Sequence, residues 1–361
     1  MNLRVQAAFW IGALLFLLLF LWIFSGILLP FIMGMALAYL LDPLADRLER
    51  AGLSRFWATI TILLLTILII TLAALIVVPV LIAQLSGFLE RLPDYVVQLQ
   101  QLLNRFLRTE LGQYFGAQQE GGGGVEQVVA QGAAWVATFL GSVWAGGRAL
   151  INTISLIVVT PVVAFYLLYD WDRMLKRIDA LLPRQHADTI RRLGDDIDAA
   201  MAGFIRGQGA VCLILGVFYA LSLSLVGLNF GFLIGSLAGL ISFIPFVGSI
   251  VGFVLSVGVA IVQFWPDWPW ILVVAAIFVV GQFIEGNILQ PRLVGSSIGV
   301  HPVWLMFALF AFGSLFGFVG VLLAVPVTAA IGVLVRFAVE RYRRSALYQG
   351  ADRGPPTSTG R

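Results

Sequence analysis

The residue most capable of chemistry is Glu285, which ends a long uncharged stretch that begins near Trp270. Gln282 and Asn287 lie within about one helical turn of it. A carboxylate with two amides could ligate a cation, accept a proton or hydrogen-bond a hydroxylated solute. A charge at a bilayer centre costs about 2.5–3.5 kcal/mol on insertion scales, so such a residue is a functional candidate by default. The alternative is a charge at the membrane edge paired with Arg292.

The predicted substrate or ion site extends around this carboxylate. Gly286 follows Glu285 and lets backbone carbonyls open toward the site. The predicted binding residues are Glu285, Gln282, Asn287, Arg292 and Gln290.

Two apolar runs share a broken pattern that resembles the interrupted helices of transporters. Ser242–Gly248 interrupts an uncharged run from about 231 to 263, and Ser314–Gly320 interrupts another from about 303 to 335. Each run exceeds the roughly 20 residues that cross a bilayer. The Gly and Pro residues in these runs interrupt the helix and leave backbone groups without hydrogen-bond partners, which lipid cannot supply. Paired breaks of this kind point to a transporter's binding site. Chance similarity is the alternative, and each run is either a hairpin or one tilted helix.

A second set of residues is predicted to gate or hinge the membrane segments. Arg206 and Gln208 lie where a charged segment enters an apolar one, and Arg206 either anchors at the headgroups or pairs with a carboxylate. The predicted gating and hinge residues are Arg206, Gln208, Pro245, Gly248, Gly317, Gly320 and Pro291.

Other kinds of site lack support in the sequence. Cys212 is the single cysteine, and His186 and His301 are too few and too far apart for a metal cluster. The glycine tract at 121–124 lacks the Lys-Ser/Thr ending of a phosphate-binding loop, and no catalytic triad pattern occurs. We expect no enzyme activity, no cofactor, no metal and no nucleic-acid partner.

The composition defines the fold class that must position these residues. Hydrophobic residues make up 60% of the 361 and charged residues 11%, against about 25% charged in soluble domains. The apolar stretches are continuous, which excludes an alternating outer-membrane barrel. We predict an all-α polytopic membrane protein in contact with the lipid bilayer.

The chain divides by hydropathy into six predicted parts. A helical hairpin turning near Ser25–Pro30 is expected to end at Asp42-Pro43, because proline disfavours helix at the residue before it. The parts are N-terminal membrane helices (1–83), extracytoplasmic amphipathic helices (84–148), a span (149–169), a charged cytoplasmic helical segment (170–206), a transport-type membrane domain (207–344) and a disordered tail (345–361). The charged segment is a solvated face or a lever tied to the next span.

Orientation follows from arginine and lysine near the spans. The loop containing Arg47, the 170–206 segment and the C-terminal arginines are the basic ones, which places them in the cytoplasm. The amphipathic helices between them fall outside, and their apolar stripes exceed what one chain can cover. We therefore expect a homo-oligomer.

Several motifs together resemble one family. They are Leu29-Pro30-Phe31 through Asp42-Pro43, Phe204–Gln208, Ile244–Gly248, Glu285–Pro291, and His301-Pro302 through Phe312–Gly317 to Ala324-Val325-Pro326. The chain resembles the autoinducer-2 exporter (AI-2E) family of bacterial membrane proteins from about Val5 to Arg344. The resemblance implies about eight membrane segments, with interrupted or hairpin segments in the C-terminal half. It also implies a multi-pass protein of the bacterial inner membrane with cytoplasmic termini. Homo-oligomeric assembly, with a pentamer as one candidate, and transport without ATP are expected as well.

Three functions remain open at this point. The first is a secondary transporter that exports a small polar solute such as autoinducer-2, coupled to protons or another ion. The second is a sodium/proton antiporter that exchanges its ions at Glu285. The third is a non-transporting membrane scaffold for envelope proteins, which would need neither Glu285 nor the broken runs.

Overall fold

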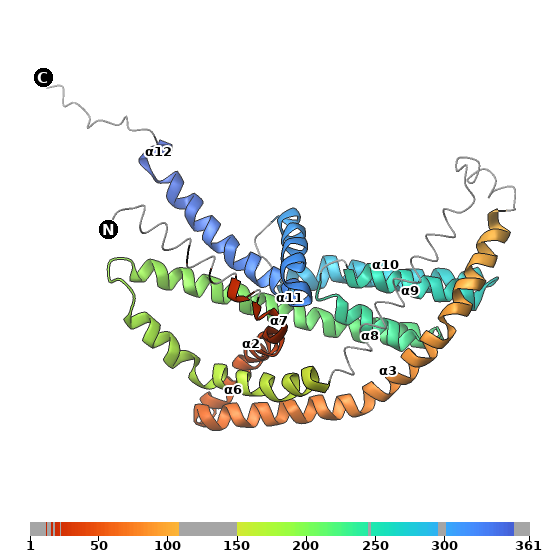
Figure 1. The fold of residues 1–361 in the computed structure, drawn as a ribbon, viewed down its shortest axis with the longest axis horizontal. Helices are drawn as coiled ribbons and strands as arrows, with labels where there is room; N and C mark the ends of the chain where they lie inside the picture. The colour runs from red at the N-terminus through yellow and green to blue at the C-terminus, as the bar shows by residue number, and fades with distance from the viewer. Residues whose placement is uncertain are drawn as a thin grey trace, which may run out of the picture. The chain divides into compact units, whose positions relative to one another are not determined.

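The computed structural model describes residues 12, 16, 19–21, 23–107, 150–244, 247–294 and 301–349, and these form helices joined by short turns (Figure 1). No strand occurs among them. The elements are η1 (Ser25–Ile27), α2 (Leu28–Arg50), α3 (Arg55–Leu107), α6 (Leu150–Ala180), α7 (Ala187–Leu225), α8 (Gly231–Ile241), α9 (Val247–Phe264), α10 (Trp268–Ile284), η2 (Glu285–Val294), α11 (Pro302–Arg343) and α12 (Ala346–Gln349). The predicted amphipathic helix after the glycine tract and residues 350–361 of the predicted tail lie outside the described residues, whereas residues 346–349 of that tail form α12.

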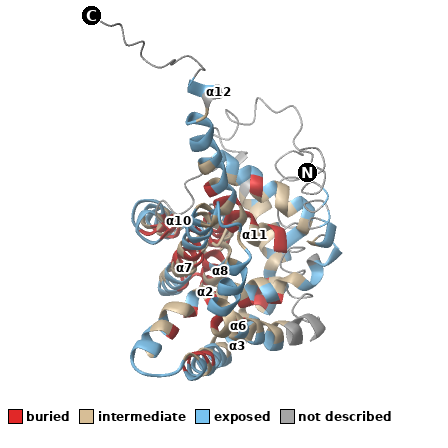
Figure 2. Ribbon diagram, turned by 90° about the vertical axis from the view of Figure 1, so that its left-hand side faces the viewer, coloured by how far each residue is buried: buried red, intermediate tan, exposed pale blue. Residues whose placement is uncertain are grey.

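Six of the described helices are long and apolar enough to cross a membrane. They are α2, α3, α7, α9, α10 with its extension to Val294, and α11. Much of the surface of these helices is exposed (Figure 2). In α3, only 11% of the most apolar stretch of 18 residues is buried. Exposed apolar surface on this scale fits helices whose solvent is lipid. The prediction of an all-α polytopic membrane protein is confirmed.

The chain forms two compact units, each built from separate stretches. The larger unit comprises Met33–Tyr169 and Gly207–Leu293, and the smaller comprises Met1–Ile32, Asp170–Arg206 and Val294–Arg361. A unit boundary thus falls at 293/294, inside the segment expected to be one transport-type domain. The functional division stays a prediction, because compactness does not test which residues transport a solute.

In the larger unit, α2, α3 and α6 share a core and an ionic cluster. Arg55, at the start of α3, lies 2.8 Å from Asp42 and 2.6 Å from Asp46, and its Nε donates to the Leu168 carbonyl at 2.9 Å. The buried core residues are Ala38, Leu41, Ala45, Ile62, Leu63, Ala164 and Leu168.

The expectation that the first helix ends at Asp42-Pro43 is wrong, because α2 continues to Arg50 with Pro43 inside it. Asp42, Asp46 and Glu49 are spaced four and three residues apart, so a continuous helix presents all three to Arg55. This shared partner and the burial of Ala45 outweigh the local cost of the proline.

The predicted span 56–83 and the amphipathic helix after it are one continuous helix, α3. The Gln84 carboxamide accepts a hydrogen bond from the Leu233 backbone N–H at 2.9 Å, at the start of α8. Leu85 and Phe88 are buried, and the Phe88 ring packs edge-on against Phe230 at 5.3 Å. The polar residues after 83 therefore continue the helix, because α8 supplies partners for them.

Close glycine packing joins α7 to α8. Gly231, Gly235 and Gly239 recur every four residues and lie on one face of α8. A Cβ built on Gly239 would lie 2.1 Å from the Gly216 Cα, and one on Gly235 would lie 2.3 Å from the Ala220 nitrogen. Small residues at this spacing let two helix backbones touch, as is typical of helix pairs in membranes.

Both broken runs turn back on themselves. The first run becomes α8 and α9, which pack together. A Cβ built on Gly248 would lie 2.4 Å from the Ser242 nitrogen, so the two arms are very close at the turn. The second, in the smaller unit, is interrupted inside α11 at Gly317, where φ is 60° and ψ is −140°. A Cβ on Gly320 would lie 1.9 Å from the Phe312 carbonyl oxygen. The hairpin alternative therefore describes both runs better than a single tilted helix.

The expected count of about eight membrane segments stays a prediction. The described residues before 23 are scattered, and α11 reverses direction within one apolar run, so the number of crossings depends on how each arm lies in the bilayer.

Candidate functional site

Glu285 lies where α10 ends and the wider η2 helix begins. η2 has π-helical hydrogen bonding over ten residues, Glu285–Val294, and includes Pro291. Such segments are rare and are frequently found at functional sites. The Glu285 side chain is 3% exposed, and Gln290, five residues on, hydrogen-bonds to it. The expectation that Gly286 lets backbone carbonyls open toward the site stays a prediction.

One oxygen of this carboxyl has no partner. Oε2 of Glu285 is fully buried, and no group in the described residues hydrogen-bonds to it. A buried ionised carboxylate without a compensating partner is costly, so the group must take up a proton, a cation or a solute hydroxyl. The orphaned oxygen is thus the atom of this site best placed for binding.

Two polar side chains of α7 also interact with this carboxyl. Glu285 interacts electrostatically with the Cys212 thiol and the Tyr219 hydroxyl. Tyr219 is fully buried, its ring stacks on Phe278 at 4.6 Å, and its hydroxyl also lacks a hydrogen-bond partner among the described residues. A Cβ on Gly281 would lie 2.3 Å from that hydroxyl, so this glycine leaves the space that the tyrosine occupies.

Sequence reasoning missed Tyr219 and its electrostatic interaction with Glu285. The available signal was a tyrosine inside the uncharged run from 209 to 228, where a phenolic hydroxyl requires a polar partner. Glu285 could not be identified as the interacting group, because it lies more than 60 residues away along the chain.

Two predicted site residues lie on a different surface from the Glu285 carboxyl. Gln282 and Asn287 line a groove of about 450 Å³ between α9 and α10, together with Ser249, Phe253 and Phe283. The Asn287 amide donates to the Phe283 carbonyl at 3.1 Å. The structure therefore brings these two amides to one groove rather than to the buried carboxyl.

Arg292 is exposed, and within the part of the chain that the structure describes no ion pair joins it to Glu285. The alternative of a membrane-edge ion pair between the two residues thus finds no support. Arg292 and Gln290 both lie on η2, and only Gln290 contacts the carboxyl.

Gln208 ties α7 to the first break. Its side chain is 1% exposed, and its Nε2 donates to the Ser242 carbonyl at 2.6 Å. Ser242 caps the end of α8, and its own hydroxyl donates to the Ala238 carbonyl at 2.8 Å. A carbonyl freed by the break is thus satisfied by a side chain from a neighbouring helix, as lipid-embedded backbone requires.

The remaining predicted hinge residues are placed as follows. Gly248 packs against Ser242 in the larger unit, whereas Gly317 and Gly320 lie in the smaller unit, and Arg206 is half-buried on α7. Pro245 lies outside the described residues. The convergence of both breaks on Glu285 therefore stays a prediction.

The described residues offer no cluster of three His, Cys, Asp or Glu side chains that could hold a metal ion. A carboxyl with a phenol and an amide can accept a proton, supply oxygen ligands to a hard cation, or hydrogen-bond to hydroxyls.

Comparison with known proteins agrees with this architecture. Residues 11–340 match the model of the AI-2E family transporter. The chain is 30% identical over 348 residues to "Putative transport protein YrrI" of Bacillus subtilis, covering 92% of this chain and 96% of the relative. It is 28% identical over 322 residues to "Putative permease PerM" of Escherichia coli, covering 86% of this chain and 87% of the relative. The family match spans nearly the whole chain, including both broken runs and Glu285, and with these relatives it shows that the chain belongs to the AI-2E family of membrane transporters.

Proposed function

We propose that this protein is a secondary transporter that exports a small polar solute such as autoinducer-2, with export coupled to a proton or sodium gradient at Glu285. The observation that supports this most directly is the buried Glu285 carboxyl with an unpartnered Oε2. A polyhydroxylated solute offers the hydroxyl donors that such an oxygen accepts.

The surroundings of the carboxyl support coupling as well as binding. Burial disfavours an ionised carboxylate that has no partner, so protonation or the binding of a cation stabilises the site. Binding a solute or an ion there changes the electrostatic cost of the site, so occupancy and protonation are linked. Gly248 and Gln208 lie beside the first break, where a change in hydrogen bonding would move one arm of the hairpin against α7.

A second candidate is a sodium/proton antiporter. The same orphaned oxygen favours it, because exchange of a proton for Na⁺ at one carboxyl needs no solute site. The two functions differ in what moves: an antiporter transports Na⁺ without any organic solute, whereas an exporter transports the solute.

We also propose that the protein lies in the bacterial inner membrane with both termini in the cytoplasm and assembles as a homo-oligomer. The arginines of the 170–206 segment and the end of α11 support the orientation. The exposed apolar faces of α3 and α10 support both lipid contact and a subunit interface.

The decisive experiment compares wild type with Glu285→Gln in proteoliposomes under imposed proton and sodium gradients. We expect Glu285→Gln to abolish gradient-driven flux while leaving folding and assembly intact, because the amide keeps the shape of the side chain and removes the charge. Glu90→Gln, an exposed carboxylate on α3, is the matched control and should transport normally.

The outcomes separate the candidate functions. Autoinducer-2 flux that depends on a gradient supports the exporter, and ²²Na⁺ flux against a proton gradient without solute supports the antiporter. Wild-type flux in Glu285→Gln, with its pH and sodium dependence unchanged, would rule out this site. No flux of either kind in the wild type would favour the scaffold.

A further inference from the structure

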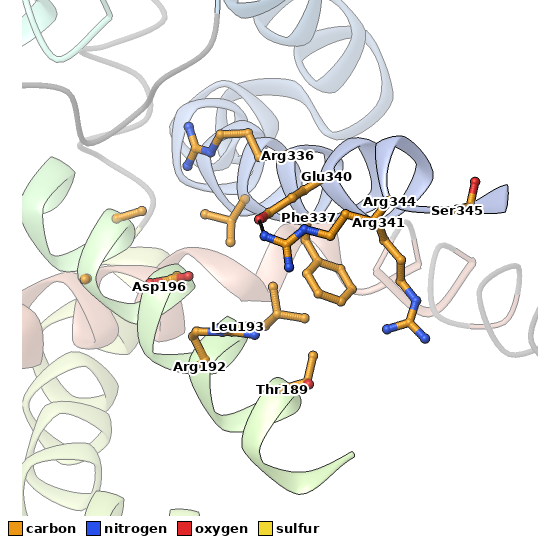
Figure 3. Close-up of a pocket in the computed structure, with 13 residues that line it drawn as sticks. Thr189, Arg192, Leu193, Asp196, Arg336, Phe337, Glu340, Arg341, Arg344 and Ser345 are labelled. Carbon is orange, nitrogen blue, oxygen red and sulfur yellow. Dashed lines mark hydrogen bonds and ion pairs between the residues drawn. The ribbon is translucent and has the colours of Figure 1, made fainter. Parts of the chain in front are cut away.

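A separate groove in the smaller unit has the chemistry of a headgroup site. It lies between the first turns of α7 and the last turns of α11, and its volume is about 1010 Å³ (Figure 3). The two helices pack closely at Ala200, Ala329 and Val333. From that contact the groove continues toward the start of α7 and the end of α11, where Thr189 and Ser345 line it.

The walls of the groove are basic. Four arginines and two carboxylates line it, an excess of two positive charges. Glu340 already pairs with Arg344, and Arg336 also has an interaction partner. Among the described residues, neither Arg192 nor Arg341 forms an ion pair. These two guanidinium groups, one from each helix, are the free cations of the groove.

The floor of the groove is apolar. Leu193, Val333 and Phe337 line it, and in Figure 3 the Phe337 ring points from α11 into the space beside α7. Arg336 is the first charge after the uncharged run from Val303 to Val335. By hydropathy, the groove therefore opens where α11 leaves the hydrocarbon and enters the headgroup layer.

We propose that this groove binds the headgroup of an anionic phospholipid. The phosphodiester is held by Arg192 and Arg341, whose planar guanidinium groups form paired, charge-assisted hydrogen bonds with phosphate oxygens. The glycerol backbone and the first acyl carbons lie on Phe337 and Leu193. The Asp196 carboxylate on α7 accepts a hydrogen bond from a headgroup hydroxyl. This favours phosphatidylglycerol over a lipid whose headgroup has no hydrogen-bond donor. Basic pockets between membrane helices recognise anionic lipids in this way.

Two other occupants fit the groove less well. Residues 350–361 come next after α12 in the sequence. They contain one Asp and two Arg, so their charge does not complement a basic groove. Free inorganic phosphate would satisfy the arginines but would leave the apolar floor exposed to water. The combination of free guanidinium groups and an aromatic floor is what selects an amphiphile.

The test uses the full-length protein in detergent and counts bound lipids by native mass spectrometry during titration with phosphatidylglycerol or phosphatidylcholine. We expect wild type to prefer phosphatidylglycerol, and Arg192→Gln/Arg341→Gln to weaken that binding at least tenfold, because a hydrogen bond to a charged group is worth roughly that factor. Arg177→Gln/Arg343→Gln removes the same charge from exposed positions outside the groove and should bind as wild type does.

Each result decides for or against the lipid. Loss in the groove variant alone, with its melting temperature within the range of the control, establishes the site. Equal affinity in wild type and the groove variant, or equal loss in the control, overturns it. Inorganic phosphate that binds wild type but not the groove variant, without any preference for phosphatidylglycerol, replaces the lipid by a soluble anion. The readout is lipid binding rather than flux, so it is independent of whether Glu285 couples transport.

Discussion

The chain turns in two ways, according to the surroundings of the turn. Inside its apolar runs it reverses at glycine, with the arms so close that Gly248 and Gly320 have no room for a Cβ. At its charged turns it is held by arginine, with Arg55 closing α2 onto α3 and Arg191 joining α6 to α7. Lipid offers no partner to a freed backbone group, so an apolar turn must satisfy itself by close packing. A turn in water can use flexible ion pairs instead.

This comparison predicts that the apolar turns tolerate substitution far less than the charged ones. The largest effect is expected at the second break, where Gly320→Ala would place a Cβ 1.9 Å from the Phe312 carbonyl oxygen. The contact atom is backbone, so the hairpin itself must open, at a cost of at least about 3 kcal/mol. Gly258→Ala on α9 is the control, because open space surrounds that position.

The measurement is the melting temperature and the fraction of monodisperse protein after solubilisation. Gly320→Ala should lower both, and Gly258→Ala should leave both near wild type. Equal behaviour of the two variants would show that the close packing at the second break is not what holds it.

The first break differs from the second because a side chain from another helix supports it. Gln208→Leu removes the donor to the Ser242 carbonyl and leaves that oxygen buried without a partner. We expect a loss of about 2 kcal/mol in stability, the usual cost of an unsatisfied buried polar group. Gln208→Glu should be similarly unstable at neutral pH, because an ionised carboxylate cannot donate.

Thermal unfolding of the Gln208 variants checks this expectation, with Gln263→Leu as an amide control at the other end of α9. Gln263 accepts from the Asn229 N–H and donates to the Gly227 carbonyl, but it is only half-buried. A larger loss at Gln263 than at Gln208 would mean that the break is not the more sensitive end of the hairpin.

The breaks were the part of the fold that the sequence predicted best. Gly and Pro inside uncharged runs weaken a helix that lipid would otherwise favour, so the positions near 242–248 and 317 followed from local chemistry. What failed was the prediction of helix ends from local signals: Pro43 does not end α2, and the polar residues after Ala83 do not end α3. In both cases a partner on another helix decides the outcome, namely Arg55 on α3 for α2 and Leu233 on α8 for α3.

The candidate site was predictable only in part for the same reason. Glu285 stood out as a lone charge in an apolar segment, and its burial agrees with that reasoning. Gln290, one of the predicted binding residues, hydrogen-bonds to the carboxyl from the fifth position along the wider η2 helix. Gln282 and Asn287, which were expected beside the carboxyl, line a separate groove instead. Tyr219 joins the site through helix packing at Gly281, which no local pattern encodes.

At the charged turns the expected effects are smaller. Arg55→Gln leaves Asp42, Asp46 and Glu49 facing one another without their shared cation, and it removes the donor to Leu168. The Arg55 side chain is 19% exposed, so water screens part of the loss and we expect about 1–2 kcal/mol. Arg47→Gln, exposed on the same turn of the chain, should change the melting temperature little.

Arg55→Lys sharpens this prediction. Lysine keeps the charge but replaces the planar guanidinium group with one compact ammonium group. That group cannot reach the three carboxylates and the Leu168 carbonyl at once. Stability between those of wild type and Arg55→Gln would support a network, whereas full recovery with lysine would reduce the cluster to a simple charge effect.

The smallest effect is expected at the turn between α6 and α7, and it depends on pH. Arg191 donates to both Asp179 oxygens at 2.6 and 3.0 Å, and these hydrogen bonds lower the pKa of Asp179 below its ordinary value. A carboxyl whose pKa is lower in the folded state stabilises that state above its unfolded pKa, about 3.9, and the contribution disappears as pH falls through the lower folded value. Asp179→Asn should therefore be slightly less stable than wild type at neutral pH, and the two melting curves should converge in acid. Asp195→Asn, which replaces an exposed carboxylate on α7, is the control and should melt near wild type at neutral pH. A gap between wild type and Asp179→Asn that persists unchanged to the lowest accessible pH would show that packing rather than ionisation holds this turn, and the contrast with the apolar turns would then lose one of its two charged examples.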